Sequence, residues 1–209
     1  MTASGFIDND IFIKLVACNL LEDVLQVIGF EPHHVGVLAS AKYVFKKNRK
    51  VAAAYLEEVR LLAIEKLGQF QAVEADHGDE TFKRLNSSRL DIDVGEAILI
   101  SKAVQTKESL LLTGDKRCLA ALNTSPDLED IHKALQGRVL CLEQLIQKLI
   151  QSRGFLWIQG SSKQLSIYDI TLKIAFGWSV ENDEVQVIAA LTSYVTSLQV
   201  ECGGLLIEG

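Results

Sequence analysis

Residues 109–122 read SLLLTGDKRCLAAL. Three consecutive leucines predict a buried β-strand over residues 109–112, because a brief apolar run bounded by turn residues is typical of a strand inside a sheet. A polar turn that contains Asp115 ends this run, and residues 116–122 show the apolar spacing of a helix. A buried strand, a short turn and a helix form the building unit of α/β folds.

The same unit recurs along the chain. Near its start, FIDND (residues 6–10) joins an apolar strand to a helix whose apolar residues recur every three or four positions. Strands that alternate with helices are joined by right-handed crossovers, which makes the sheet parallel and covers both of its faces. We therefore expect an α/β fold with a central parallel sheet flanked by helices. The expected strands cover residues 6–8, 35–38, 109–112 and 138–141, and the expected later helices cover residues 21–28, 51–67, 94–104, 116–122 and 142–151.

The pattern of strands that alternate with helices ends at Gly154. We expect an α/β domain over residues 1–153 and a mainly helical C-terminal extension over residues 154–209. Within the extension, residues 155–158 suggest a short strand and residues 182–198 a helix with an apolar stripe. The stripe favours packing against the α/β domain, with the surface of a homodimer or of a partner protein as the alternative.

The composition excludes several classes of protein. Hydrophobic residues make up 48% and charged residues 23% of the 209 positions, and the mean hydropathy is +0.19, which argues against disorder. The N-terminus lacks a signal-peptide pattern, and no apolar run approaches the ~20 residues of a membrane span, so we expect no membrane association. A net charge of −6 argues against a protein that coats nucleic acid by bulk charge. Widely spaced cysteines favour reduced thiols and a cytoplasmic protein, and they are Cys18, Cys118, Cys141 and Cys202.

Acidic side chains follow two of the expected strands and open one of the expected helices. Asp8 and Asp115 come after strands, and Asp93 and Glu96 stand at the start of the helix over residues 94–104. Because ligands of parallel sheets bind beyond the carboxyl ends of the strands, we expect these acids to share one crevice. Carboxylates so gathered repel each other, and oxygen-binding divalent cations remove that conflict. The sequence therefore predicts a site for one or two Mg²⁺ or Mn²⁺ ions.

Three motifs resemble those of the PIN-domain ribonucleases, a family that includes toxin nucleases of toxin–antitoxin pairs. They are FIDND (6–10), DVGEA (93–97) and LLTGDKR (111–117), and the resemblance covers about residues 5–150. It implies a three-layer PIN-like fold and a metal-dependent endoribonuclease in which a metal-activated water attacks the RNA phosphodiester. It also implies RNA as the substrate and an antitoxin protein as a partner that silences the enzyme.

Residue by residue, the resemblance carries over four acids. Asp8 matches the first acid of the family, Asp93 and Glu96 the acids at the central helix, and Asp115 the acid after the next strand. The resemblance implies that all four are catalytic and bind the metal. The supporting residues are Thr113, which matches a hydroxyl beside the last acid, and Asn9 next to Asp8.

The sequence departs from the family pattern at two places. Lys42 and Tyr43 stand where many members carry a further glutamate, and Arg117 stands where many carry a second aspartate. We expect Glu96 to replace the missing glutamate from the helix. The same departures keep open a catalytically inactive PIN-like scaffold that acts as a binding module.

Simpler roles and another enzyme class compete for the same acids. Asp8 can cap a helix, Asp93 and Glu96 can form a capping box, and Asp115 can be a turn residue. Asp8 and Asp10 after a first strand also resemble the haloacid dehalogenase-like phosphatases. In that family the first aspartate is the nucleophile and the second is the acid/base.

A basic segment follows the second expected strand. Its five cations are interleaved with two aromatic residues, which suits contacts with RNA phosphates and stacking on an unpaired base. The alternative is a solvated helix edge. The cations expected to bind RNA are Lys42, Lys46, Lys47, Arg49 and Lys50.

Overall fold

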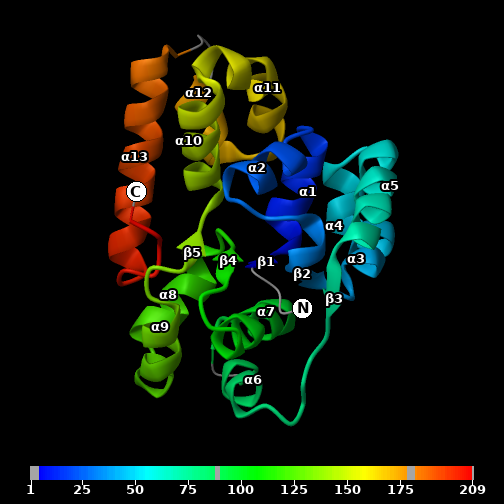
Figure 1. Cartoon of the computed structure of the whole chain (residues 1–209), viewed down its shortest axis with the longest axis vertical. Coiled ribbons are helices and arrows are strands. Elements are labelled where there is room, and N and C mark those ends of the chain that lie inside the picture. Colours follow the sequence, from blue (N-terminus) through cyan, green and yellow to red (C-terminus); the bar gives the residue numbers. More distant parts are fainter. Residues whose placement is uncertain (1–4, 88–89, 178–181, 209) are drawn as a thin grey trace.

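The structure is a computed structural model that describes residues 5–87, 90–177 and 182–208. Its centre is a five-stranded sheet in the order β3-β2-β1-β4-β5, and every pair of neighbouring strands is parallel (Figure 1). The prediction of an α/β fold with a central parallel sheet is thus confirmed. The strands are β1 (Gly5–Ile7), β2 (Val35–Leu38), β3 (Gln71–Val73), β4 (Leu110–Leu112) and β5 (Val139–Leu140).

The order of the strands creates a switch point between β1 and β4. The chain runs from β1 outward to β2 and β3, and then returns to place β4 on the other side of β1. Ile7 pairs with Leu112 at the ends of these two strands, and the Asp8 amide donates to the Leu112 carbonyl oxygen at 3.0 Å. A crevice opens beyond the carboxyl ends of the strands at such a switch point.

Helices cover both faces of the sheet, which gives three layers. Figure 1 shows α7 on one face and α1, α2 and α10 on the other. This division follows from the right hand of parallel crossovers, since the chain reverses its direction across the sheet after β3. The helices are α1 (Asn9–Ala17), α2 (Leu21–Val27), α3 (Ala41–Lys47), α4 (Arg49–Ala54), α5 (Glu57–Lys66), α6 (Glu80–Leu85), α7 (Val94–Gln105), α8 (Lys116–Thr124), α9 (Glu129–Leu135), α10 (Leu142–Arg153), α11 (Phe155–Tyr168), α12 (Ile170–Phe176) and α13 (Glu184–Glu201).

The prediction of one continuous helix over residues 51–67 is wrong. The chain is extended at Tyr55 and Leu56, and this break separates α4 from α5. Tyr55 leaves the helical path to stack on Tyr168 of α11, with the ring centroids 4.8 Å apart. A contact between residues more than a hundred positions apart therefore overrides the local helical preference.

The expected strand over residues 155–158 is also wrong, because these residues form the first turn of α11. Phe155 and Ile158 are buried, whereas Leu156 and Trp157 between them are exposed. Burial three positions apart is a helical pattern, and a four-residue apolar run cannot by itself distinguish a helix from a strand.

The C-terminal helices share the hydrophobic core of the sheet. Phe155, Ile158, Leu191 and Leu198 belong to the same buried cluster as Phe6 of β1. The chain after α13 runs along β5, where the Val139 amide donates to the Leu205 carbonyl oxygen at 3.0 Å. This segment covers one edge of the sheet. In the described part of the chain, no helix combines the length and the hydropathy that crossing a bilayer requires.

Candidate functional site

Three helices point their N-termini at the crevice between β1 and β4, and each begins with an aspartate as its N-cap. Asp8 caps α1, Asp93 caps α7 and Asp115 caps α8. In each case a carboxylate oxygen accepts a backbone N–H of the first turn, at 2.7 Å for Asp8, 2.8 Å for Asp93 and 2.9 Å for Asp115. The capping roles expected for Asp8 and Asp93 are therefore present. They do not exclude a chemical role, since the same geometry gathers the carboxylates at one place.

The capped helix ends enclose a pocket of about 430 Å³. All four acids of the sequence motifs line this pocket, together with Asp10 and Asn9. Two cations from the start of α8 face the same space. The lining residues are Asp8, Asn9, Asp10, Leu38, Asp93, Gly95, Glu96, Leu99, Gly114, Asp115, Lys116 and Arg117.

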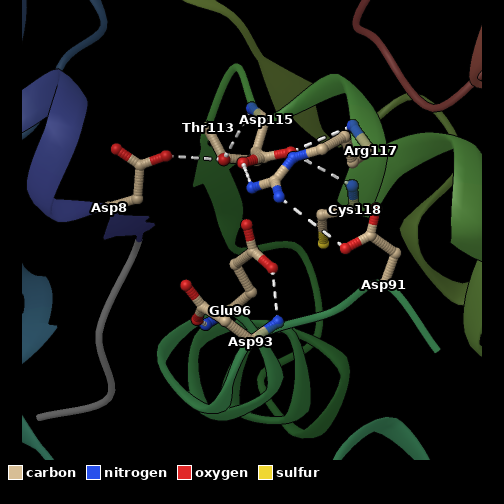
Figure 2. A network of polar contacts seen from close by, with 8 residues as sticks. All are labelled: Asp8, Asp91, Asp93, Glu96, Thr113, Asp115, Arg117 and Cys118. Atoms are coloured by element: carbon tan, nitrogen blue, oxygen red, sulfur yellow. Dashed lines mark hydrogen bonds and ion pairs between the residues drawn. The ribbon is translucent and has the colours of Figure 1, made fainter. Parts of the chain in front are cut away.

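Asp8 is held from two sides. The Thr113 hydroxyl donates to Asp8 Oδ2 at 2.6 Å (Figure 2). The Ile11 amide donates to Asp8 Oδ1 at 2.7 Å. Burial raises the pKa of Asp8 to about 6, although both hydrogen bonds act to lower it, and the neighbouring Asp10 adds to the rise. The Asp8 carboxylate therefore lies in a place where its own negative charge is unfavourable.

Glu96 rises from the first turn of α7 toward Asp115 (Figure 2). Its Oε2 atom accepts the Asp93 amide at 2.7 Å, which completes a capping box with Asp93. Burial raises the pKa of Glu96 to about 7, and the negative charges of Asp93 and Asp115 add to the effect. Gly95 lets this turn approach the sheet, because a Cβ there would lie 2.8 Å from Cδ1 of Leu38.

Asp115 has its own counter-ion. Arg117 Nη2 lies 2.7 Å from Asp115 Oδ2, and Arg117 Nη1 lies 3.7 Å from an oxygen of Asp91. Burial acts to raise the pKa of Asp115, but the Arg117 guanidinium and the Cys118 amide outweigh it and hold this pKa below its usual range. Burial raises the pKa of the Cys118 thiol, so this sulfur remains protonated beside the acids.

The donors at this site suit a hard divalent cation. Five carboxylates and two cationic side chains line one pocket, and every atom that the carboxylates offer to a metal ion is an oxygen. Within the described ranges, no three His, Cys, Asp or Glu side chains are arranged as a group that could hold a metal ion. The carboxylate oxygens instead accept hydrogen bonds from helix amides, from Thr113 and from Arg117. Mg²⁺ usually binds through only one or two carboxylates plus waters, so the donor set fits such an ion.

The basic segment lies outside the pocket. Three of its cations are on α3 and two on α4, and all five are exposed. None of them forms an ion pair with another described residue. This segment follows β2, whose last residue Leu38 lines the pocket. RNA binding there stays a prediction. The five residues are Lys42, Lys46, Lys47, Arg49 and Lys50.

Some residues of the site were not singled out from the sequence. Lys116 lines the pocket beside Arg117, and Lys14 forms an ion pair with Asp10 of the pocket wall. The spacing of four between Asp10 and Lys14 on a helix signals such a pair. By contrast, the second partner of Lys14 is Asp169, and no pattern in the sequence indicates that contact.

Comparisons of the chain with protein-family models, with curated proteins and with solved structures give no match. The functional interpretation therefore depends on the motifs and on the geometry of the pocket.

Proposed function

We propose that the protein is a PIN-like, metal-dependent endoribonuclease that hydrolyses RNA phosphodiester bonds with Mg²⁺ or Mn²⁺. The observation that carries this proposal is the pocket at the carboxyl ends of β1 and β4, where Asp8, Asp93, Glu96 and Asp115 come together. Burial raises the pKa of Asp8 to about 6 and that of Glu96 to about 7, and neighbouring carboxylates add to both rises. Perturbed carboxyls in a cleft are typical of functional sites.

In this proposal the four acids would hold one or two cations, each through one or two carboxylates plus waters. When bound, the cation supplies positive charge that polarises a phosphate and makes a water molecule more acidic. Thr113 orients Asp8 through its hydroxyl hydrogen bond. Lys116 lines the pocket at the start of α8, where its positive charge would attract a phosphate.

The basic segment on α3 and α4 supports RNA as the substrate. Its exposed lysines and arginine add positive charge near a pocket in which acids outnumber cations, and Tyr43 is exposed among them. Basic side chains bind RNA phosphates with a salt-dependent affinity, and an aromatic ring stacks on an unpaired base. We further propose that the enzyme is a toxin that an antitoxin protein silences, as the resemblance implies.

Cleavage of RNA by a matched set of variants tests this proposal. Purified protein is incubated with a mixed RNA pool, with Mn²⁺ or with a chelator, and compared with Asp115→Asn and Asp183→Asn. Asparagine caps a helix about as well as aspartate does, so both variants keep their helices. Asp183 caps α13 and does not line the pocket, which makes its variant the control. We expect cleavage by the wild-type protein and by Asp183→Asn only. Equal cleavage by Asp115→Asn would refute the proposal.

One observation favours a second candidate, a PIN-like scaffold that binds a partner without catalysis. Asp115 is already paired with Arg117, and the described acids do not form a ready-made metal-ligand group. A melting curve recorded with Mn²⁺ separates the two candidates, because a ligand that binds only the folded state must raise the melting temperature. An unchanged melting temperature at millimolar Mn²⁺ favours the scaffold.

The haloacid dehalogenase-like phosphatase stays the third alternative, in which Asp8 would be the nucleophile and Asp10, paired here with Lys14 at 2.6 Å, the acid/base.

A further inference from the structure

A largely buried lysine joins the pocket wall to the C-terminal helices. Lys14 Nζ lies 2.6 Å from Asp10 Oδ2 and 3.0 Å from Asp169 Oδ2. Asp10 lines the pocket, and Asp169 stands between α11 and α12. The side chains of Lys14 and Asp169 are only 15% and 14% exposed, whereas that of Asp10 is 65% exposed. The ion pairs therefore reach from the interior of the protein to the rim of the pocket.

Asp169 is itself fixed by the helix that it caps. Its Oδ1 atom accepts the Leu172 amide of α12 at 3.0 Å, while its Oδ2 atom accepts a hydrogen bond from Lys14. Burial acts to lower the pKa of Lys14, but the carboxylates of Asp10 and Asp169 outweigh it and hold this pKa above its usual range. The ammonium group thus remains charged between two carboxylates, one of which cannot move without breaking a helix cap.

A second interaction reaches the opposite part of the pocket. Lys116 lines the pocket from α8, and its Nζ atom lies 4.2 Å from the ring centroid of Tyr194 on α13. An ammonium over an aromatic face is an attractive arrangement. The C-terminal helices therefore act on two pocket-lining side chains, on Asp10 through Lys14 and on Lys116 directly.

We propose that Lys14 is a positioning residue of the pocket. Lys14 fixes the side chain of Asp10 at the rim, and Asp169 in turn fixes the side chain of Lys14. The pair of Asp10 and Lys14 alone would be a surface ion pair of little energetic value and variable geometry. Asp169, which is largely buried, removes that variability because it restricts Lys14 to one position. The C-terminal helices thereby contribute to the construction of the site. The effect on cation binding and on RNA rests on the proposed function, whereas the link between α1 and α12 does not.

Three variants of the full chain test this role. Lys14→Met combined with Asp169→Asn removes the link without leaving a buried charge unpaired, and the asparagine keeps the cap of α12. Lys14→Arg retains a cation between the two acids and is the rescue variant. Asp183→Asn changes an N-cap of the same C-terminal region that forms no ion pair with another described residue, and it is the control.

Hydrogen exchange measures the link without any ligand. In the double variant we expect amides in α1 and in α12 to exchange at least about threefold faster, because the ion pair no longer joins the last turn of α1 to the start of α12. The control should leave both segments unchanged. Unchanged exchange in α1 and α12 of the folded double variant would overturn the inference.

Mn²⁺ titration and cleavage kinetics measure the consequence for the site. We expect the double variant to bind Mn²⁺ with an affinity changed at least about threefold, and to cleave RNA with kcat lowered about tenfold and KM little changed, since small misplacements at a site are costly. Lys14→Arg should restore most of the wild-type affinity and rate. Faster exchange with wild-type Mn²⁺ affinity and kcat would mean a purely structural link, which also overturns the positioning role.

These readouts separate this inference from the proposed function. A wild-type protein that binds Mn²⁺ but cleaves no RNA would refute the nuclease, and the Mn²⁺ affinities of the variants would still decide the role of Lys14. If the wild-type protein also binds no Mn²⁺, the exchange data decide. A joint increase in α1 and α12 then supports the link, and its absence overturns it.

Discussion

Replacement of Asp8 by asparagine should make the folded protein more stable at neutral pH. Burial raises the pKa of Asp8 from its ordinary value of 3.8 to about 6. Below pH ~4 the carboxyl is protonated in both the folded and the unfolded chain, so no difference arises there. Between pH ~4 and ~6 the unfolded chain releases this proton while the folded chain retains it, so stability falls as the pH rises. Above pH ~6 the full cost of the buried charge is present.

The size of this cost follows from the two pKa values. The interval from 3.8 to about 6 corresponds to about 3 kcal/mol at 1.36 kcal/mol per pH unit. Asp8 is partly accessible to solvent, so this figure is an upper limit, and we expect a gain of about 1–2 kcal/mol from Asp8→Asn. An asparagine Oδ1 can still accept the Ile11 amide, and its NH₂ can donate to Thr113 once that hydroxyl turns. For a chain of this length, each kcal/mol shifts the melting temperature by about 2–4 °C.

Denaturant titrations of the wild-type protein and of Asp8→Asn, at pH values from 4 to 8, measure this effect. The variant should have the larger free energy of unfolding. Its advantage over the wild type should be largest above pH ~6 and should shrink toward pH ~4. Added Mn²⁺ should stabilise the wild-type protein more than the variant, because the cation offsets the charge that the variant lacks. Asp183→Asn provides the control. If the difference in the free energy of unfolding between Asp8→Asn and the wild type were the same at pH 4 and at pH 8, the reasoning on Asp8 would be refuted.

Three further results are expected. Asp93→Ala should cost about 1–2 kcal/mol of stability because the capping box is broken, whereas Asp93→Asn should cost only a few tenths, and both should weaken Mn²⁺ binding if the carboxylate holds the cation. The double variant Lys46→Ala/Lys50→Ala should bind RNA with a weaker dependence on salt. The slope of log K against log salt concentration should be less steep by about 0.7 for each phosphate that the protein no longer binds. An unchanged slope would mean that RNA binds elsewhere. Leu191→Ala, at a fully buried position of α13, should cost about 2–5 kcal/mol in a denaturant titration. Val185→Ala, at a position that is 76% exposed on the same helix, should stay within about 0.5 kcal/mol of the wild type.

The elements of the core could be predicted because their signals are local. The leucines of β4 and the apolar run of β2 are short buried strands, and an apolar run between turn residues needs no tertiary contact to be recognised. The edge strand β3 (Gln71–Val73) could not be predicted because it lacks such a local signal. Its residues are half-buried or exposed, and it pairs only with β2, so it carries no apolar run.

The gathering of the acids could also be anticipated, but their partners could not. Aspartates that follow strands and open helices indicate caps near the carboxyl edge of a sheet. The hydrogen bond from Thr113 to Asp8 joins residues 105 positions apart, and Arg117 pairs with Asp91 as well as with Asp115. Burial has the largest effect on the pKa values of the acids, and it depends on which strands become neighbours.

The amino-acid sequence by itself determined the alternation of strands and helices, the N-caps and the short list of acids, because these features depend on propensities and hydrogen bonds within a few residues. Only the tertiary structure decided that β4 lies beside β1, that Tyr55 leaves its helix for Tyr168, and that Asp169 holds Lys14. Each of these interactions joins segments far apart along the chain. Its energy arises only when the whole core has packed, so no local pattern encodes it.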